Sequence, residues 1–313
     1  MGRNRPIAAF LIVLAFLASF AGCRSTKDRD GAAPSEKMTA REQAGYLGPV
    51  QTVKCETADF STRDGKRVEG ARVPSLETSY NRRGDVTEER WYDSSGNLDF
   101  RVLFTHDAKG NVREVVRRDA QDNLLERHVY RHDSKGRPTE SLAHDSEGQL
   151  TMKGEYRHDA KENAVECVFR DEKGLQRNRR LDAQDTKGRR IRTESYDADN
   201  TLKWRTLISY SPNDTRIEET SSDYNPDGSL DRKTVSTYDA RRRILSEATY
   251  AAAGSLLERF EYTYEYDWRG NPIKQTRLRL VQKEGLPGEG ASIYEPESVT
   301  YLTLTYFPDA PTQ

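Results

Sequence analysis

The chain has 313 residues, with 50 Lys or Arg and 51 Asp or Glu, so its net charge at pH 7 is −1. Positively and negatively charged residues are interspersed along the sequence, which argues against the basic face that nucleic-acid binding requires. Hydrophobic residues make up only 34% of the chain, a low fraction for a globular protein. We therefore expect a thin, repetitive architecture that does not bind nucleic acid.

The first residues predict export. Two arginines in residues 1–5 precede an almost wholly apolar run, Ile7–Phe20, which small residues follow. This is the pattern of a secretory signal, and the run is shorter than the about 20 apolar residues of a membrane span. Residues 23–45 are polar without apolar periodicity, so we expect a flexible tether there.

The stretch LASFAGC, Leu17–Cys23, resembles a bacterial lipobox. The resemblance implies that residues 1–22 are a lipoprotein signal peptide and that Cys23 is acylated, for example with palmitate, and anchors the protein to a membrane. The alternative is a plain cleaved signal with a chance cysteine. Arg24 stands where an aspartate would resemble an inner-membrane retention signal. The implied location is therefore the outer membrane, on its periplasmic or its surface side.

From residue 80 onward the sequence repeats one turn signal, Asp-x-x-Gly-Asn, usually after Tyr or His. Asp and Asn side chains start turns, and Gly supplies the positive φ that closes them. The spacing between successive turns alternates between 12 and 14 over the first ten copies, so the repeating unit is the sum of the two, about 26 residues. The first residues of the turns are Asn81, Asp93, Asp107, Asp119, Asp133, Asp145, Asp159, Asp171, Asp185, Asp197, Ser211, Asn225, Asp239, Ala251 and Asp267.

Each half of the unit predicts one short strand, and such short connections join antiparallel neighbours. The predicted fold is all-β: an elongated antiparallel meander of about 16 short strands, curled or spiral, built from two-strand YDxxGN repeats. Within a β-repeat domain at 46–313, the repeats would occupy 80–275. Residues 46–79 and 276–313 would form caps, and the closing strand would be Ser298–Phe307.

Both spacings are even, so strand alternation predicts that equivalent positions keep one face of the sheet. The longer strands carry aromatic and apolar rows on that face, for example Phe100, Val102 and Phe104. The shorter strands carry glutamates at the same offset, which would form a ladder on the aromatic face. Pairing with arginines across the strands is one interpretation of this ladder. The four residues are Glu88, Glu114, Glu140 and Glu166.

The Tyr-Asp-x-x-Gly-Asn pattern resembles the YD repeats of the RHS family, most closely in YTYEYDWRGNPI, Tyr262–Ile273. The resemblance covers roughly residues 80–273. It implies long antiparallel sheets that wind into shells or spirals, and a link to carbohydrate binding and adhesion. The chain is more similar to small secreted lipoproteins built from such repeats than to the large toxin-bearing members.

The pattern favours binding over catalysis. The sequence shows no Gly-x-Ser-x-Gly elbow, phosphate loop or His-Glu-x-x-His motif. Aromatic rings flanked by charges suit stacking on sugar rings, although they also suit the core of a thin sheet. The candidate binding surface is Trp91, Trp204, Trp268 and Tyr264.

We therefore expect a non-enzymatic scaffold or binding surface at the cell envelope, with an envelope glycan or an envelope protein as partner. Two alternatives stay open. One is a glycosidase-like hydrolase that uses a pair of the four glutamates. The other is a module that adds a partner's strand to an exposed sheet edge. A transmembrane barrel is not expected, because GLQRNRRL, Gly174–Leu181, cannot supply a lipid-facing band.

No cofactor and no metal site are expected. His106, His132 and His158 recur once per repeating unit in positions where other units have tyrosine, so aromatic packing accounts for them. The turn aspartates are accounted for by their role in the turns. Cys55 and Cys167 are too few for a disulfide framework, and whether they pair stays open.

Overall fold

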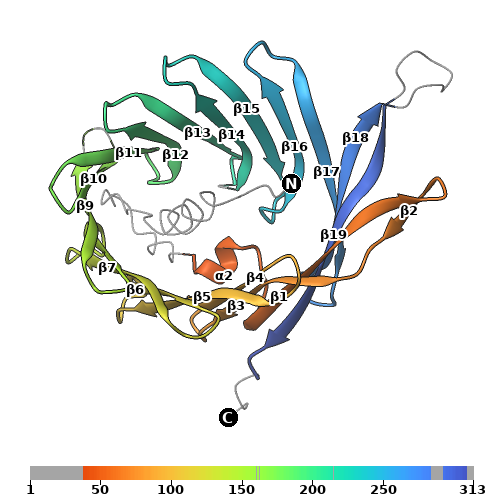
Figure 1. Ribbon diagram of the computed structural model, residues 1–313, viewed down its shortest axis with the longest axis horizontal. Coiled ribbons are helices and arrows are strands. Elements are labelled where there is room, and N and C mark those ends of the chain that lie inside the picture. The colour runs from red at the N-terminus through yellow and green to blue at the C-terminus, as the bar shows by residue number, and fades with distance from the viewer. Residues whose placement is uncertain (1–37, 160, 162, 214, 283–291, 309–313) are drawn as a thin grey trace.

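The computed structural model describes residues 38–159, 161, 163–213, 215–282 and 292–308. A short helix, α2, precedes a long series of antiparallel strands (Figure 1). The elements are α2 (Ala40–Gln43), β1 (Val50–Arg63), β2 (Lys66–Glu69), β3 (Val73–Tyr80), β4 (Val86–Tyr92), β5 (Leu98–His106), β6 (Val112–Asp119), β7 (Leu124–His132), β8 (Pro138–Asp145), β9 (Leu150–Asp159), β10 (Ala164–Asp171), β11 (Gln176–Gln184), β12 (Arg190–Asp197), β13 (Leu202–Tyr210), β14 (Arg216–Tyr224), β15 (Leu230–Tyr238), β16 (Ile244–Ala251), β17 (Leu256–Tyr266), β18 (Pro272–Gln282) and β19 (Ser292–Tyr306).

The strands close into a ring. From β3 to β19 each strand pairs with its sequence neighbours, and β1 pairs with both β3 and β19. Eighteen strands thus form a closed antiparallel barrel, while β2 pairs with the far half of β1 outside the ring (Figure 1). The predicted open meander, curled or spiral, is therefore wrong. The two expected caps, residues 46–79 and 276–313, pair with each other through β1 and β19, as in Lys54 opposite Thr303.

The repeated turn forms as the sequence predicts. In the β4–β5 turn, Asp93 Oδ1 accepts hydrogen bonds from the backbone N–H groups of Ser95 (2.8 Å) and Asn97 (2.9 Å). Gly96 takes the left-handed conformation, with φ 82°. The spacing of 12 or 14 is therefore a strand of 7 residues, such as β4, or of 9 residues, such as β5, plus a five-residue turn.

A one-residue register shift accompanies nearly every turn. At the β4–β5 hairpin Tyr92 pairs with Leu98, whereas the preceding residue, Trp91, pairs with Phe100. The extra residue is a β-bulge, which moves equivalent positions of long and short strands to opposite faces. The expectation that all equivalent positions share one face is therefore wrong.

Helix α2 lies inside the ring and identifies its inner wall (Figure 1). Thr39 forms a capping box with Glu42, and Ala40 is buried against Val50, Val53 and Tyr80. Helix α2 therefore belongs to the fold, although it lies within the predicted tether of residues 23–45. Among the residues that the structure describes, no helix has the length and hydropathy of a membrane span.

The inner wall and the rims as candidate functional site

The long-strand aromatic rows face the lumen, the space inside the ring. Phe104 packs against the cluster that contains Ala40 of α2. Phe100 and Val102 lie on the same face of β5 as Phe104, because the three residues are spaced two apart along the strand. Ion pairs lie between these rows on the same wall, as between Arg117 and Glu126 (3.1 Å). The lumen thus presents ring faces together with hydrogen-bonding groups.

Three of the four predicted binding residues lie on this wall, but on strands that are distant in the ring. Trp91 on β4 stacks on Phe100 with ring centroids 5.8 Å apart. Trp204 on β13 pairs with Ser195 and Asp223 of the neighbouring strands. Tyr264 is on β17. The structure therefore does not gather the predicted surface into one patch.

The fourth residue, Trp268, lies in the β17–β18 turn, and its side chain is 81% exposed. The Arg269 guanidinium stacks over its ring at 4.2 Å. Tyr264, by contrast, is held in place: its hydroxyl donates to the carbonyl of Ile244 (2.8 Å), and its ring stacks on that of Tyr266. Burial raises the pKa of Tyr264.

The glutamate ladder faces outward, not toward the aromatic rows as predicted. Glu88 pairs with Leu103. Leu103 lies between Val102 and Phe104 on β5, so its side chain and that of Glu88 point to the opposite face from theirs. The bulge at each turn is the cause, because it shifts the short strands by one residue. The predicted set, Glu88, Glu114, Glu140 and Glu166, lies on β4, β6, β8 and β10.

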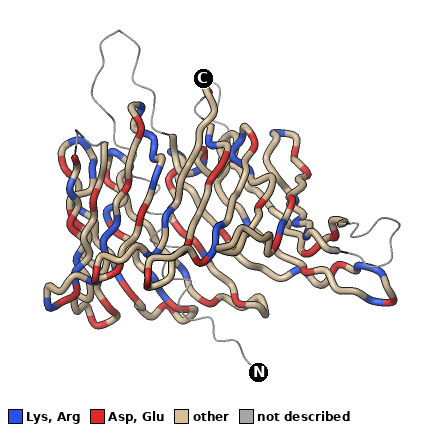
Figure 2. Tube along the Cα trace, turned by 90° about the horizontal axis from the view of Figure 1, so that it is seen from above, with Lys and Arg blue, Asp and Glu red and all other residues tan. Residues whose placement is uncertain are grey.

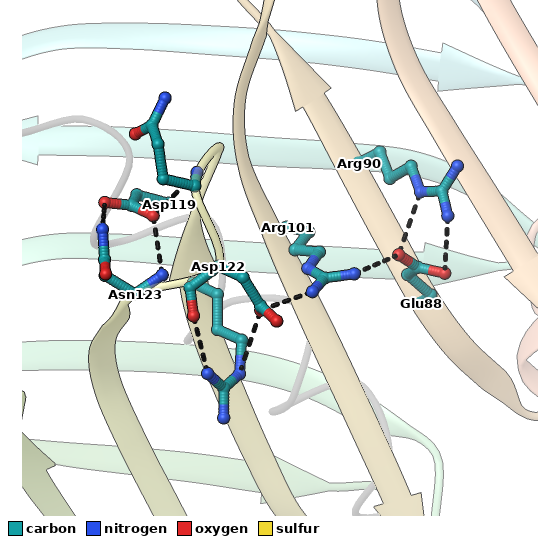
Figure 3. A network of polar contacts seen from close by, with 8 residues as sticks. Glu88, Arg90, Arg101, Asp119, Asp122 and Asn123 are labelled. Atoms are coloured by element: carbon teal, nitrogen blue, oxygen red, sulfur yellow. Dashed lines mark hydrogen bonds and ion pairs between the residues drawn. The ribbon is translucent and has the colours of Figure 1, made fainter.

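Each ladder glutamate pairs with neighbouring cations. Glu88 contacts Arg90 (2.9 Å) and Arg101 (4.0 Å), and Arg101 continues the network to Asp122 (Figure 3). Arg127 binds Glu114, Arg131 and Lys153 bind Glu140, and Arg179 binds Glu166. This geometry favours cross-strand pairing over a catalytic pair.

A carboxyl group that sequence reasoning missed lies on the inner wall. Glu89 is only 8% exposed and accepts a hydrogen bond from Trp91 Nε1 (3.2 Å). Burial raises its pKa, and the Trp91 bond partly offsets that effect. Glu126 shares this wall, but it lies on β7, three strands from Glu89, and is ion-paired with Arg117, so the two do not form the close carboxyl pair that glycoside hydrolysis requires. Its position depends on the bulge, so the sequence alone gives no signal for it.

A cavity of about 690 Å³ opens where α2 meets the turns of one rim. Met38, Tyr46 and Leu47 line it from the N-terminal segment, and Arg83, Lys109 and Arg242 line it from three turns. Sequence reasoning missed this cavity because it joins the start of the fold to a turn near the end of the chain. Its walls carry both apolar side chains and cations.

The histidines and cysteines form no shared site within the described ranges. No group of three or more potential metal ligands occurs there. His158 Nε2 lies 2.7 Å from the carbonyl oxygen of Pro138, and His106 and His132 also have partners. Cys55 on β1 and Cys167 on β10 are free thiols. Burial raises the pKa of both, to about 11 and about 12.

No protein-family model and no curated protein matches this sequence. Among solved structures, a porin-like protein from Bacteroides uniformis is similar at 10% identity and TM-score 0.45, over 82% of this chain and 98% of that one. A porin-like protein from Bacteroides vulgatus is similar at 12% identity and TM-score 0.31, over 83% and 98%. The Photorhabdus luminescens Tc holotoxin pore is similar at 8% identity and TM-score 0.20, over 77% and 19%. Because these scores lie below 0.5, the barrel assignment rests on the strand pairing of this chain.

Proposed function

We propose that the protein is a non-enzymatic binding barrel of the cell envelope that holds an envelope glycan in its lumen. The observation that carries the proposal is the inward direction of the aromatic rows. Trp91, Trp204 and Tyr264 lie on the inner wall among charged and hydroxyl side chains. Sugars offer apolar ring faces and many hydroxyls, so a wall of this mixed composition suits them.

The proposal includes anchoring through a lipid on Cys23, which lies outside the described residues, as do the signal peptide and most of the tether. A barrel fold is consistent with an outer-membrane or envelope location. The outward face carries ion pairs at mid-strand, such as Lys153 with Glu140 (3.3 Å). Charges at such positions are costly against hydrocarbon, so we propose that the barrel stands in water beside the membrane.

The two rival functions have less support from the geometry. The four ladder glutamates lie on the outward face, and each is ion-paired with a neighbouring cation. Strand addition needs an open edge, but each ring strand is paired on both sides. In the described chain, the outer edge of β2, Lys66–Glu69, is the best candidate for such an edge. We also propose that the turns are YD repeats, as their sequence and geometry suggest.

The test is binding of peptidoglycan fragments and envelope polysaccharides to the chain from residue 24, measured by calorimetry. We expect saturable binding that Trp204→Ala weakens about fivefold to thirtyfold, since loss of one stacked ring removes about 1–2 kcal/mol. Trp268→Ala is the matched control, because it removes the same side chain from the rim and should leave glycan affinity unchanged.

Circular dichroism and thermal unfolding would establish that both variants keep the barrel. Absence of binding to every glycan would reject the glycan proposal. Equal loss in the two variants would place the ligand outside the lumen and contradict the proposed site.

A further inference from the structure

The two rims of the barrel carry opposite charges at the tips of their turns. Turns that follow odd-numbered strands lie at the rim where the N-terminal segment docks, since Arg41 N–H donates to the Gly84 carbonyl and Leu47 N–H to Asn271 Oδ1. We call this the basic rim. It is formed by eight alternate turns, the first between β3 and β4 and the last between β17 and β18. The seven turns that follow the even-numbered strands from β4 to β16 form the acidic rim. In Figure 2 the barrel is seen from the side, with turns along two opposite edges.

The third residue of each turn shows the difference most directly. On the basic rim it is cationic in every turn except β13–β14, which has Asn213. These cations are Arg83, Lys109, Lys135, Lys161, Lys187, Arg241 and Arg269. On the acidic rim Lys173 is the exception, and the other third residues are Ser95, Gln121, Glu147, Asp199, Asp227 and Ala253.

Whole-turn charges agree with the tips. The described residues in the eight turns of the basic rim include twelve basic and seven acidic ones, a net charge of +5. The seven turns of the acidic rim hold one basic and ten acidic residues, a net charge of −9. A protein with an overall charge of −1 is thus strongly polarised along the barrel axis, which orients it in front of a charged surface.

Apolar side chains accompany the cations of the basic rim. Trp268 is 81% exposed at the tip of its turn, the most exposed large hydrophobic residue of the described chain. Leu47 and Met38, from the segment docked on this rim, are 39% and 38% exposed. Tryptophan next to arginine is typical of the headgroup region of a bilayer, where the ring is amphipathic and the cation meets phosphate.

We propose that the basic rim docks on an anionic phospholipid surface, with Trp268 at the level of the headgroups. The path of the chain agrees with this orientation, because the described residues begin at Met38 on the same rim. If Cys23 bears a lipid, as in the proposed function, the stretch from Cys23 to Met38 spans at most about 50 Å. Docking does not depend on that lipid, so the two proposals are separable.

The test uses unlipidated protein from residue 24, since the ring closes through pairs between residues 50 and 306. We expect co-sedimentation with vesicles of phosphatidylcholine that contain roughly 30% phosphatidylglycerol, weaker binding at higher salt, and none with phosphatidylcholine alone. Replacing Lys109, Lys135 and Lys161 together by Gln should weaken binding about 100-fold, at roughly fivefold per cation. On binding, tryptophan emission should shift to the blue, and Trp268→Phe should abolish the shift.

The matched control replaces Lys54, Lys66 and Lys173 together by Gln, which changes the net charge equally but away from the basic rim. We expect this control to bind within threefold of the parent. Equal loss in both triple variants, or absence of binding to the anionic vesicles, would overturn the proposal. Release of the protein by millimolar inorganic phosphate would assign the rim to a soluble anion and also overturn it. Glycan binding should be unaffected by the rim variants, so failure of either proposal is distinguishable.

Discussion

Asn271 holds three distant parts of the chain together and is fully buried. Its side-chain amide donates to the Leu47 carbonyl (3.0 Å) and to the Tyr306 hydroxyl (2.8 Å), and its Oδ1 accepts from Leu47 N–H. One residue of the last repeated turn therefore binds both the N-terminal segment and the final strand. The sequence marks Asn271 as an ordinary turn residue and does not predict this role.

We expect Asn271→Ala to lower the free energy of unfolding by about 3 kcal/mol, because it leaves buried polar partners unsatisfied. Urea unfolding followed by circular dichroism would measure the change. Asn97→Ala is the control: Asn97 occupies the same turn position on the acidic rim, where it is exposed, so the cost should stay below about 1 kcal/mol. Similar costs at the two sites would contradict the assigned role of Asn271.

Glu89 gives a pH-dependent prediction. Burial raises the pKa of its carboxyl in the folded state, so its contribution to stability is full below the ordinary pKa of Glu. That contribution is lost as pH rises through the raised value, because ionisation then occurs in a buried site. Glu89→Gln should therefore stabilise the protein relative to the parent more at pH 8 than at pH 4. Urea unfolding at both pH values is the measurement, and a pH-independent difference would contradict it.

At the scale of the element, the sequence predicts the turns well and the faces of the strands poorly. Asp, Gly and Asn fix the turn through local hydrogen bonds and backbone conformation, as at Asp93 and Gly96. The bulge beside each turn depends on pairing across the hairpin, which an even spacing does not reveal. One extra residue was enough to place Glu88 outside the barrel instead of inside.

The left-handed position of the turn can be tested at Gly148, which has φ 80° and no atom within 4 Å of an added Cβ. We expect Gly148→Ala to destabilise the protein by about 1 kcal/mol through backbone strain alone. Gly148→Asn should cost less, because Asn tolerates this conformation, as Asn200 does naturally with φ 61°. Thermal unfolding of both variants is the measurement, and a larger cost for Asn would show that the side chain meets an obstacle.

At the scale of the molecule, closure of the ring converts an expected surface into an inner wall. Repeats and turns specify neighbouring strands, but they do not specify how far the sheet curves before its ends meet. Here β1 and β19 meet through pairs between residues near opposite ends of the chain, such as Val53 with Leu304. The candidate aromatic residues could be chosen from sequence, whereas their inward direction and the charge difference between the rims required the closed ring.

Leu302→Cys tests that closure directly. Leu302 lies opposite Cys55 across the β1–β19 seam, and directly paired residues have Cα atoms about 4.5–5.5 Å apart, within disulfide range. We expect a disulfide to form and to stabilise the protein by up to about 5 kcal/mol, since it closes a loop of nearly the whole chain. Because burial raises the pKa of Cys55 to about 11, copper phenanthroline should be used as the oxidant.

Non-reducing gel mobility and mass spectrometry of the linked peptides would measure the bond. Thr303→Cys is the matched control, because Thr303 pairs with Lys54 and its side chain points to the opposite face of the seam from Cys55. Linkage in Leu302→Cys but not in Thr303→Cys requires both the closed ring and the stated register. In an open sheet the two edges would be far apart and neither variant would form the bond, so the lumen, and with it the proposed binding site, would be lost.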